Sequence, residues 1–235
     1  MRVFLAILLA AFATCAHAQY YNSLAGRQFN NMYAANADFL MSQMIQQSGW
    51  AAMRASVEAA ANKKAGAAQP QAAPMQKKAA YKLPIAASDF KPTGPRRVPE
   101  LLAEGATSPK DRQDLIVAGR QIQQGIEGTP GFRKNNVAAA MTVLLGVSIQ
   151  VLNGQELSDD ESDALMYGLN DELAALESFK SMPADKRTQA YDTFVIIGGF
   201  IAGIFQAGME TRNAALQEQA RSMARDALAK FGVEA

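Results

Sequence analysis

The sequence has 235 residues, with 23 basic and 22 acidic side chains, one cysteine and one histidine. This near balance of charge gives no support for a nucleic-acid-binding protein, because such proteins normally carry a basic excess on one face. The length allows one or two domains with a sizeable apolar core.

The N-terminus, residues 1–18, is typical of a secretory signal peptide. Arg2 supplies a short positive region, residues 3–12 form an apolar stretch too short to span a bilayer comfortably, and residues 16–18 form an Ala-His-Ala cleavage site. We predict cleavage after Ala18 and export, to the periplasm or as a secreted protein. A lipoprotein alternative would use Cys15, but the residues before it depart from the usual lipoprotein pattern.

Cleavage would remove both Cys15 and His17, the only thiol and the only imidazole in the chain. The mature protein would then have no disulfide, no Cys/His zinc site and no Ser-His-Asp or Cys-His catalytic group. Loss of Arg2 would leave 23 − 1 = 22 basic side chains against 22 acidic ones. We therefore expect no cofactor and no metal, and only carboxylates, lysine and tyrosine remain for acid–base chemistry.

Residues 19–62 predict a separate amphipathic helical segment. Apolar side chains recur there at three-four spacing within residues 24–62, on Tyr33, Ala37, Leu40, Met41, Met44, Ile45 and Ala52. Such a helix must dock on the main domain, on a second copy, on a protein partner or on a membrane surface. Its methionines can ligate copper(I), although methionine more often fills apolar gaps.

Residues 63–87 are rich in alanine, glutamine, lysine and proline and carry almost no large apolar side chains. Such a segment cannot bury enough surface to offset the entropy lost on ordering. We predict that it is a disordered linker.

Residues 88–235 predict the main domain, an all-α bundle of five or six helices. Prolines keep residues 92–97 extended, and a short helix follows up to Ala103. Ser108 is the predicted N-cap of the next helix, which Gly128 and Pro130 end.

Asn135 or Asn136 can cap the following helix, and we take Asn135 as the cap. This helix is apolar on most sides and ends at Gly154. Ser158 and Glu161 then form a capping box that begins the next helix.

The longest uncharged apolar stretch outside the N-terminus is residues 193–209, inside a helix that begins near Pro183. At about 25 Å this stretch falls short of the roughly 30 Å hydrocarbon core of a bilayer. We predict that it is the buried hub of the bundle, and a short membrane span is the alternative. The residues that define the hub are Phe194, Ile197, Gly199, Phe200, Gly203, Ile204 and Phe205.

Three groups of charged residues were considered as sites. Acidic residues cluster at 159–163 and could bind a hard cation, but acids at a helix N-terminus also interact favourably with the helix dipole. Arg96 and Arg97, with Arg133 and Lys134, could form an anion site, but solvated charges with local ion pairs are the favoured interpretation.

The third group comprises Asp171, Glu172 and Asp192. Paired carboxylates can hydrolyse glycosides without histidine, so these acids are the candidates for a carboxylate-dependent hydrolase. The only tryptophan, Trp50, lies across the linker, so no aromatic platform for a sugar accompanies them.

Four short stretches, DFKPTGPRRVPELLA, TPGFRKNNVAAAM, NGQELSD and MPADKR, resemble motifs of a family of small secreted bacterial proteins of unknown function. The resemblance covers roughly residues 88–205. It implies export and a helical fold, and it brings no activity and no functional residue.

The favoured interpretation is an exported, non-catalytic helical protein that acts through protein interaction, binding a partner or a second copy through residues 24–62. The alternatives are a membrane-attached protein with residues 193–209 as a short span, and a carboxylate-dependent hydrolase.

Overall fold

The computed structural model describes residue 57, residues 81–106 and residues 108–233. This part of the chain contains seven α-helices and one 3-10 helix, and no strand, which confirms the all-α prediction. The elements are η1 (Ile85–Ser88), α5 (Val98–Leu102), α6 (Pro109–Gly128), α7 (Val137–Asn153), α8 (Asp159–Ala175), α9 (Glu177–Lys180), α10 (Ala184–Glu210) and α11 (Ala214–Lys230). The signal peptide, Met41, Met44 and nearly all of the predicted N-terminal helix lie outside the described residues.

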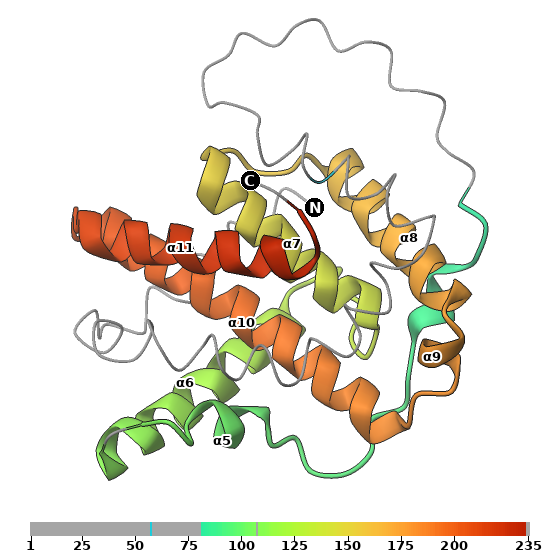
Figure 1. Ribbon diagram of the computed structural model, residues 1–235, viewed down its shortest axis with the longest axis horizontal. Coiled ribbons are helices and arrows are strands. Elements are labelled where there is room, and N and C mark those ends of the chain that lie inside the picture. Colours follow the sequence, from blue (N-terminus) through green and yellow to red (C-terminus); the bar gives the residue numbers. More distant parts are fainter. Residues whose placement is uncertain (1–56, 58–80, 107, 234–235) are drawn as a thin grey trace, which may run out of the picture.

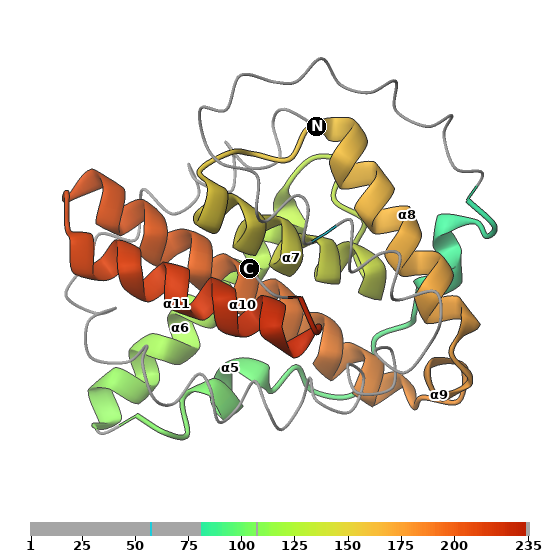
Figure 2. The ribbon, with the colours of Figure 1, turned by 45° about the horizontal axis from the view of Figure 1, so that its top comes forward.

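Helix α10 lies at the centre of the bundle (Figures 1 and 2). All fifteen residues from Ala190 to Ile204 are buried, and Phe205 is half-buried. α10 is the one described helix long and apolar enough to cross a membrane, yet 78% of its most apolar stretch is buried within the protein. Burial on every side favours the hub over the span, because a spanning helix needs an apolar surface that faces lipid.

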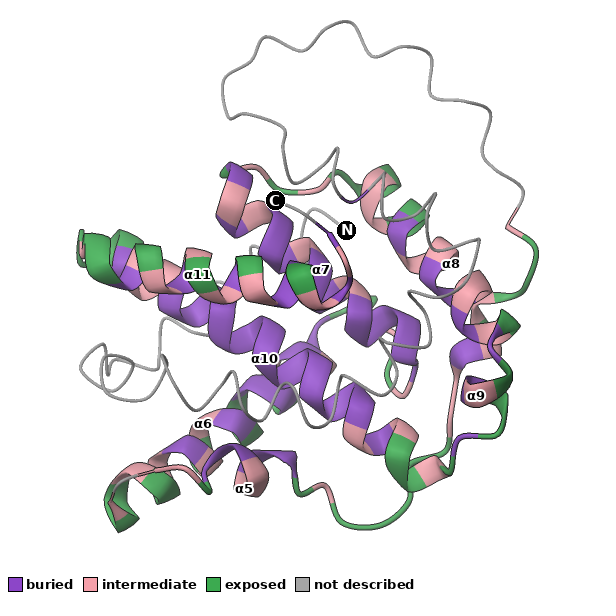
Figure 3. Cartoon of the chain, viewed as in Figure 1, coloured by how far each residue is buried: buried purple, intermediate pink, exposed green. Residues whose placement is uncertain are grey.

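The other helices surround this hub on different sides. α7 and α11 pack against α10 and against each other, α8 packs against α7, and α6 packs against α10 with α5 beside it. Figure 3 shows buried residues along most of α7 and through the middle of α10. Glycine allows α10 to approach α7 closely, since a Cβ built on Gly198 would lie 3.1 Å from the Cα of Leu144 in α7.

Helix ends follow the local chemistry of their capping residues. The hydroxyl of Ser108 accepts from the Asp111 N–H, and the Ser158 and Glu161 side chains form a capping box at the start of α8. Gly154 ends α7 in the left-handed conformation, with φ of 72°.

The cap of α7 is Asn136, and the prediction of Asn135 was wrong. Asn136 has extended backbone and its side chain accepts from the Ala139 N–H. Asn135 has a φ of 56°, and its backbone carbonyl accepts from the Phe90 N–H at 2.9 Å. Two adjacent asparagines thus have different roles, which a sequence pattern does not distinguish.

A further feature differs from the sequence expectation. Residues 81–87, placed by composition in the disordered linker, are ordered and include most of η1. The chain reverses after Glu210, and α11 begins after Asn213, whose side chain caps it. A Cβ on Gly208 would lie 2.8 Å from the Gln217 nitrogen, so this tight hairpin requires glycine.

Candidate functional site

The most elaborate polar arrangement in the described part of the chain surrounds residues 81–97, which we name the strap. In Figure 1 the strap begins beside α8, passes the beginning of α10 and ends at α5. Apart from η1 it contains no helix, so most of its backbone groups need partners from elsewhere. Side chains of the bundle supply many of them, in three fastenings.

The first fastening joins the strap to α8. The Asp171 carboxylate accepts from the Lys82 N–H at 2.8 Å and from the Leu83 N–H at 3.0 Å. Asn170, which is fully buried, accepts from both the N–H and the hydroxyl of Ser88 and donates to the Pro84 carbonyl at 3.1 Å. The side chains of Asp171 and Asn170 therefore supply the hydrogen-bond partners that a neighbouring strand would supply in a β-sheet.

Ring stacking closes the same end of the strap. The rings of Tyr81 and Tyr167 stack with centroids 4.4 Å apart and an interplanar angle of 19°. Tyr81 is the first residue of the strap, so the junction with the N-terminal segment is held against α8.

The second fastening joins the strap to the turn before α7. Arg133 donates through Nε to Asp89 at 2.8 Å, and its Nη2 also pairs with this carboxylate. Asn136 donates to Asp89 at 2.7 Å and to the Ile85 carbonyl at 2.8 Å. Although partial burial acts to raise it, these two hydrogen bonds hold the pKa of Asp89 below its ordinary value.

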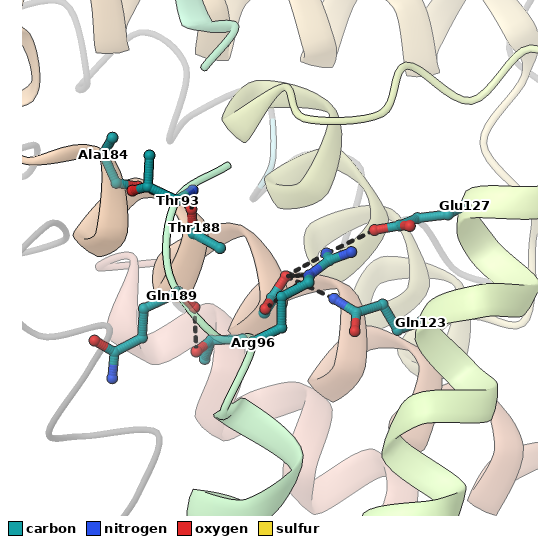
Figure 4. A network of polar contacts seen from close by, with 9 residues as sticks. Thr93, Arg96, Gln123, Glu127, Ala184, Thr188 and Gln189 are labelled. Carbon is teal, nitrogen blue, oxygen red and sulfur yellow. Dashed lines mark hydrogen bonds and ion pairs between the residues drawn. The ribbon is translucent and has the colours of Figure 1, made fainter. Parts of the chain in front are cut away.

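The third fastening is a cluster around Arg96 (Figure 4). Arg96 donates through Nε to both oxygens of Asp192, at 2.9 and 3.1 Å, and through Nη2 to Asp192 and to Glu127, the latter at 2.6 Å. Gln123 also donates to Asp192 at 2.6 Å. The strap is thus joined to both α6 and the hub helix α10.

Exposure falls sharply across this cluster. The side chain of Arg96 is 32% exposed, that of Glu127 18% and that of Asp192 0%. Burial raises the pKa of Asp192 although Arg96 and Gln123 favour its ionised form. Burial also disfavours the charged form of Arg96. Its hydrogen bonds to Asp192 and Glu127 outweigh this effect and raise the pKa of Arg96 above its ordinary value. Asp192 therefore depends on Arg96 to remain charged inside the bundle.

Tyr191 extends the cluster into the apolar core. Its ring meets Phe90 edge-on at 5.4 Å, and the Arg96 guanidinium lies 5.5 Å from the ring centroid. Its hydroxyl is buried without a hydrogen-bond partner among the described residues, and burial raises its pKa. Glu127 acts to raise this pKa further, whereas the backbone of Asn135 and the charge of Arg96 act to lower it.

The predicted anion site does not form. Arg96 pairs with Asp192 and Glu127, whereas Arg133 pairs with Asp89, and Arg97 and Lys134 are exposed. Ion pairs form instead, as the favoured interpretation expects, but they are not local, because the acidic partners of Arg96 and Arg133 lie 31 to 96 residues away in the chain.

The acidic candidates also hold structure in place. Glu161 completes the capping box, and no group of metal-ligating side chains occurs among the described residues. Asp171 holds the strap, and burial raises the pKa of its neighbour Glu172. Asp192 does meet a second carboxylate, but that carboxylate is Glu127 and both are paired with one guanidinium.

Sequence reasoning missed Gln123, Asn170 and Tyr191. The available signal was the position of Tyr191 and Asp192 directly before a long apolar stretch, since a charge there must find a partner if the helix is buried. Gln123 and Asn170 carry no comparable signal, because amides are equally common on solvated faces.

The motif stretches map onto this framework. DFKPTGPRRVPELLA contains the second half of the strap, TPGFRKNNVAAAM its partners before α7, and NGQELSD the turn between α7 and α8. In MPADKR, Arg187 donates to the Phe179 carbonyl at 2.7 Å and lies over its ring, which joins α9 to α10.

The protein is therefore an all-α bundle with a central apolar helix and an extended strap fastened across it by polar side chains, of which Asn136, Asn170 and Asp192 are fully buried. A family model described as a family of unknown function, DUF6683, matches residues 1–235, and the chain belongs to that family. This confirms the resemblance to a family without assigned function and extends it beyond residues 88–205. No curated protein and no solved structure matches the chain.

Proposed function

We propose that this protein is an exported, non-catalytic interaction protein, in which the bundle holds an N-terminal binding segment within residues 24–62. The observation that carries the proposal is the strap. Side-chain hydrogen bonds between residues far apart in the sequence anchor residues 81–97, the point where the N-terminal segment joins the bundle. Because residues 81–97 are held firmly, a partner bound to the N-terminal segment would also be held to the bundle.

The chemistry of the bundle supports a binding role over catalysis. Two of the three carboxylates proposed for hydrolysis, Asp171 and Asp192, accept hydrogen bonds from the strap, and Asp192 is fully shielded from solvent. A general acid or base must reach the proton that it transfers, so Asp192 is badly placed for that role.

The binding proposal is tested by deletion of residues 19–49 from the mature protein. We expect affinity capture with the full exported chain to recover a partner or a second copy, and the deletion to abolish that recovery while leaving the helical circular dichroism of the bundle intact. A matched control deletes residues 64–74 and so shortens the predicted linker without removing apolar residues of the helix. Capture unchanged by the deletion of residues 19–49 would remove the proposal.

Export and membrane attachment are tested by fractionation. We expect the mature protein to begin at Gln19, to reach the periplasm or the medium, and to stay soluble after a carbonate wash. Retention in the carbonate-washed membrane pellet would favour the alternative in which residues 193–209 contact lipid.

A further inference from the structure

Val57 is the one residue of the predicted N-terminal segment that the structure describes, and its side chain is buried. It is helical, its side chain is 2% exposed, and it belongs to the same apolar core as α5 to α11. A valine on an isolated helix would expose most of its side chain, so burial to this degree requires packing against other elements.

The sequence around Val57 provides a face suited to such packing. In a helix, residues three and four apart lie on one side, so Trp50, Met53 and Val57 share a face. The same spacing would place Ala55 on the opposite side of such a helix. Trp50 is the only tryptophan in the chain, and a side chain of this size contributes a large apolar area when buried.

The chain between Val57 and the strap favours docking within one molecule. The intervening 23 residues (58–80) reach about 80 Å when fully extended, and a flexible chain of this length has an end-to-end distance of about 26 Å. A domain of this size has a radius of gyration of about 15 Å, so the chain spans it easily. The effective concentration of a segment tethered in this way is in the millimolar range, which outcompetes a second copy at ordinary protein concentrations.

We propose that the helix face bearing Trp50, Met53 and Val57 packs on the apolar core of its own bundle and forms part of the folded domain. This inference refines the proposed function, because it restricts the partner-binding portion to residues upstream of Trp50. It stands independently of whether any partner binds there.

The test compares Val57→Asp with Ala55→Asp in the full mature chain. Both add one carboxylate to the same helical turn, but only Val57→Asp places it in the core. We expect Val57→Asp to lower the midpoint of thermal unfolding by at least about 5 °C and Ala55→Asp to change it by less than about 1 °C. The milder variant Val57→Ala, expected to lower the midpoint by a few degrees, keeps the test decisive if Val57→Asp does not fold.

Light scattering and the concentration dependence of unfolding distinguish the possible occupants. A monomer whose midpoint is independent of concentration supports docking within one chain. A dimer whose midpoint rises with concentration would overturn it in favour of exchange between copies. Equal, small effects of all three substitutions would overturn the docking itself. Partner capture is measured separately with the deletion of residues 19–49, so either proposal can fail without the other.

Discussion

Asn136 serves two elements with one side chain. Its Oδ1 accepts from the Ala139 N–H and so caps α7, while its amide nitrogen donates to the Ile85 carbonyl and to Asp89 in the strap. Because the residue is fully buried, losing this amide would leave several polar groups without partners. At the residue scale, the domain therefore depends on a few side chains whose partners lie far away in the sequence.

Arg96 is the residue whose loss should cost most. We predict that Arg96→Met lowers the free energy of unfolding by about 3 kcal/mol, because it leaves the buried Asp192 carboxylate without its counter-charge. Urea unfolding measures this, with Arg97→Met as the control, since Arg97 is the exposed neighbour. Adding Asp192→Leu should recover much of the loss. An Arg96→Met protein as stable as the Arg97→Met control would contradict the role of the ion pair.

For Tyr191, in contrast to Arg96, we predict that a substitution costs no stability. Tyr191→Phe removes a buried hydroxyl that has no described partner and retains the ring contacts with Phe90 and Arg96. We expect the free energy of unfolding to stay the same or to rise by up to about 1 kcal/mol, measured by urea unfolding. A loss of more than about 1 kcal/mol would show that the hydroxyl is hydrogen-bonded, with Glu127 as the candidate acceptor and the Asn135 N–H as the candidate donor.

Asp89 gives a prediction about pH. Its pKa is lower in the folded protein than in the unfolded chain, so its stabilisation is present above the unfolded pKa and is lost as pH falls toward the folded pKa. Asp89→Asn should lower the free energy of unfolding by about 1 kcal/mol at pH 7, allowing for solvent screening. That difference from the unmodified chain should shrink as pH falls from 5 to about 3. A difference that stays constant over this range would exclude the Arg133 ion pair as its cause, and Glu104→Gln, at an exposed position, is the control.

At the element scale, two helical glycines should respond differently to the same substitution. Gly198→Ala would place a methyl group 3.1 Å from the Leu144 backbone, in a contact between two buried helices that cannot easily separate. Gly146→Ala meets only the end of the Leu157 side chain at 3.5 Å. We expect Gly198→Ala to lower the thermal midpoint, and Gly146→Ala to maintain or raise it, because alanine favours helix over glycine by about 1 kcal/mol. Equal gains at both positions would show that α7 and α10 are not in close contact.

Elements with local signals could be predicted from the sequence. Ser108, Ser158 and Gly154 are caps whose chemistry lies within a few residues, and the periodicity of the bundle helices is also local. The order of residues 81–87 could not be predicted, because it depends on Asn170, Asp171 and Asn136, which are distant in sequence, and not on the apolar content of the segment itself. The candidate site follows the same rule: the arginines stand out in the sequence, whereas their partners do not.

At the scale of the whole molecule, one helix explains the architecture. α10 is apolar on all sides because α7, α11, α6 and α5 surround it, and the buried charge beside its apolar stretch, Asp192, pairs with Arg96 of the strap. The strap therefore both neutralises the hub and fixes the point from which the N-terminal segment extends. Anchoring and core formation depend on the same contacts.

The most direct test of this account is amide hydrogen exchange, followed by mass spectrometry of peptides that cover residues 81–97. The N–H groups of Lys82, Leu83, Ser88 and Phe90 are hydrogen-bonded to the bundle, so we predict exchange far slower than in an unfolded chain. Arg96→Met should accelerate exchange in the strap more than in α7, with Arg97→Met as the control. Exchange of the unmodified strap at the rate of an unfolded chain would contradict the account.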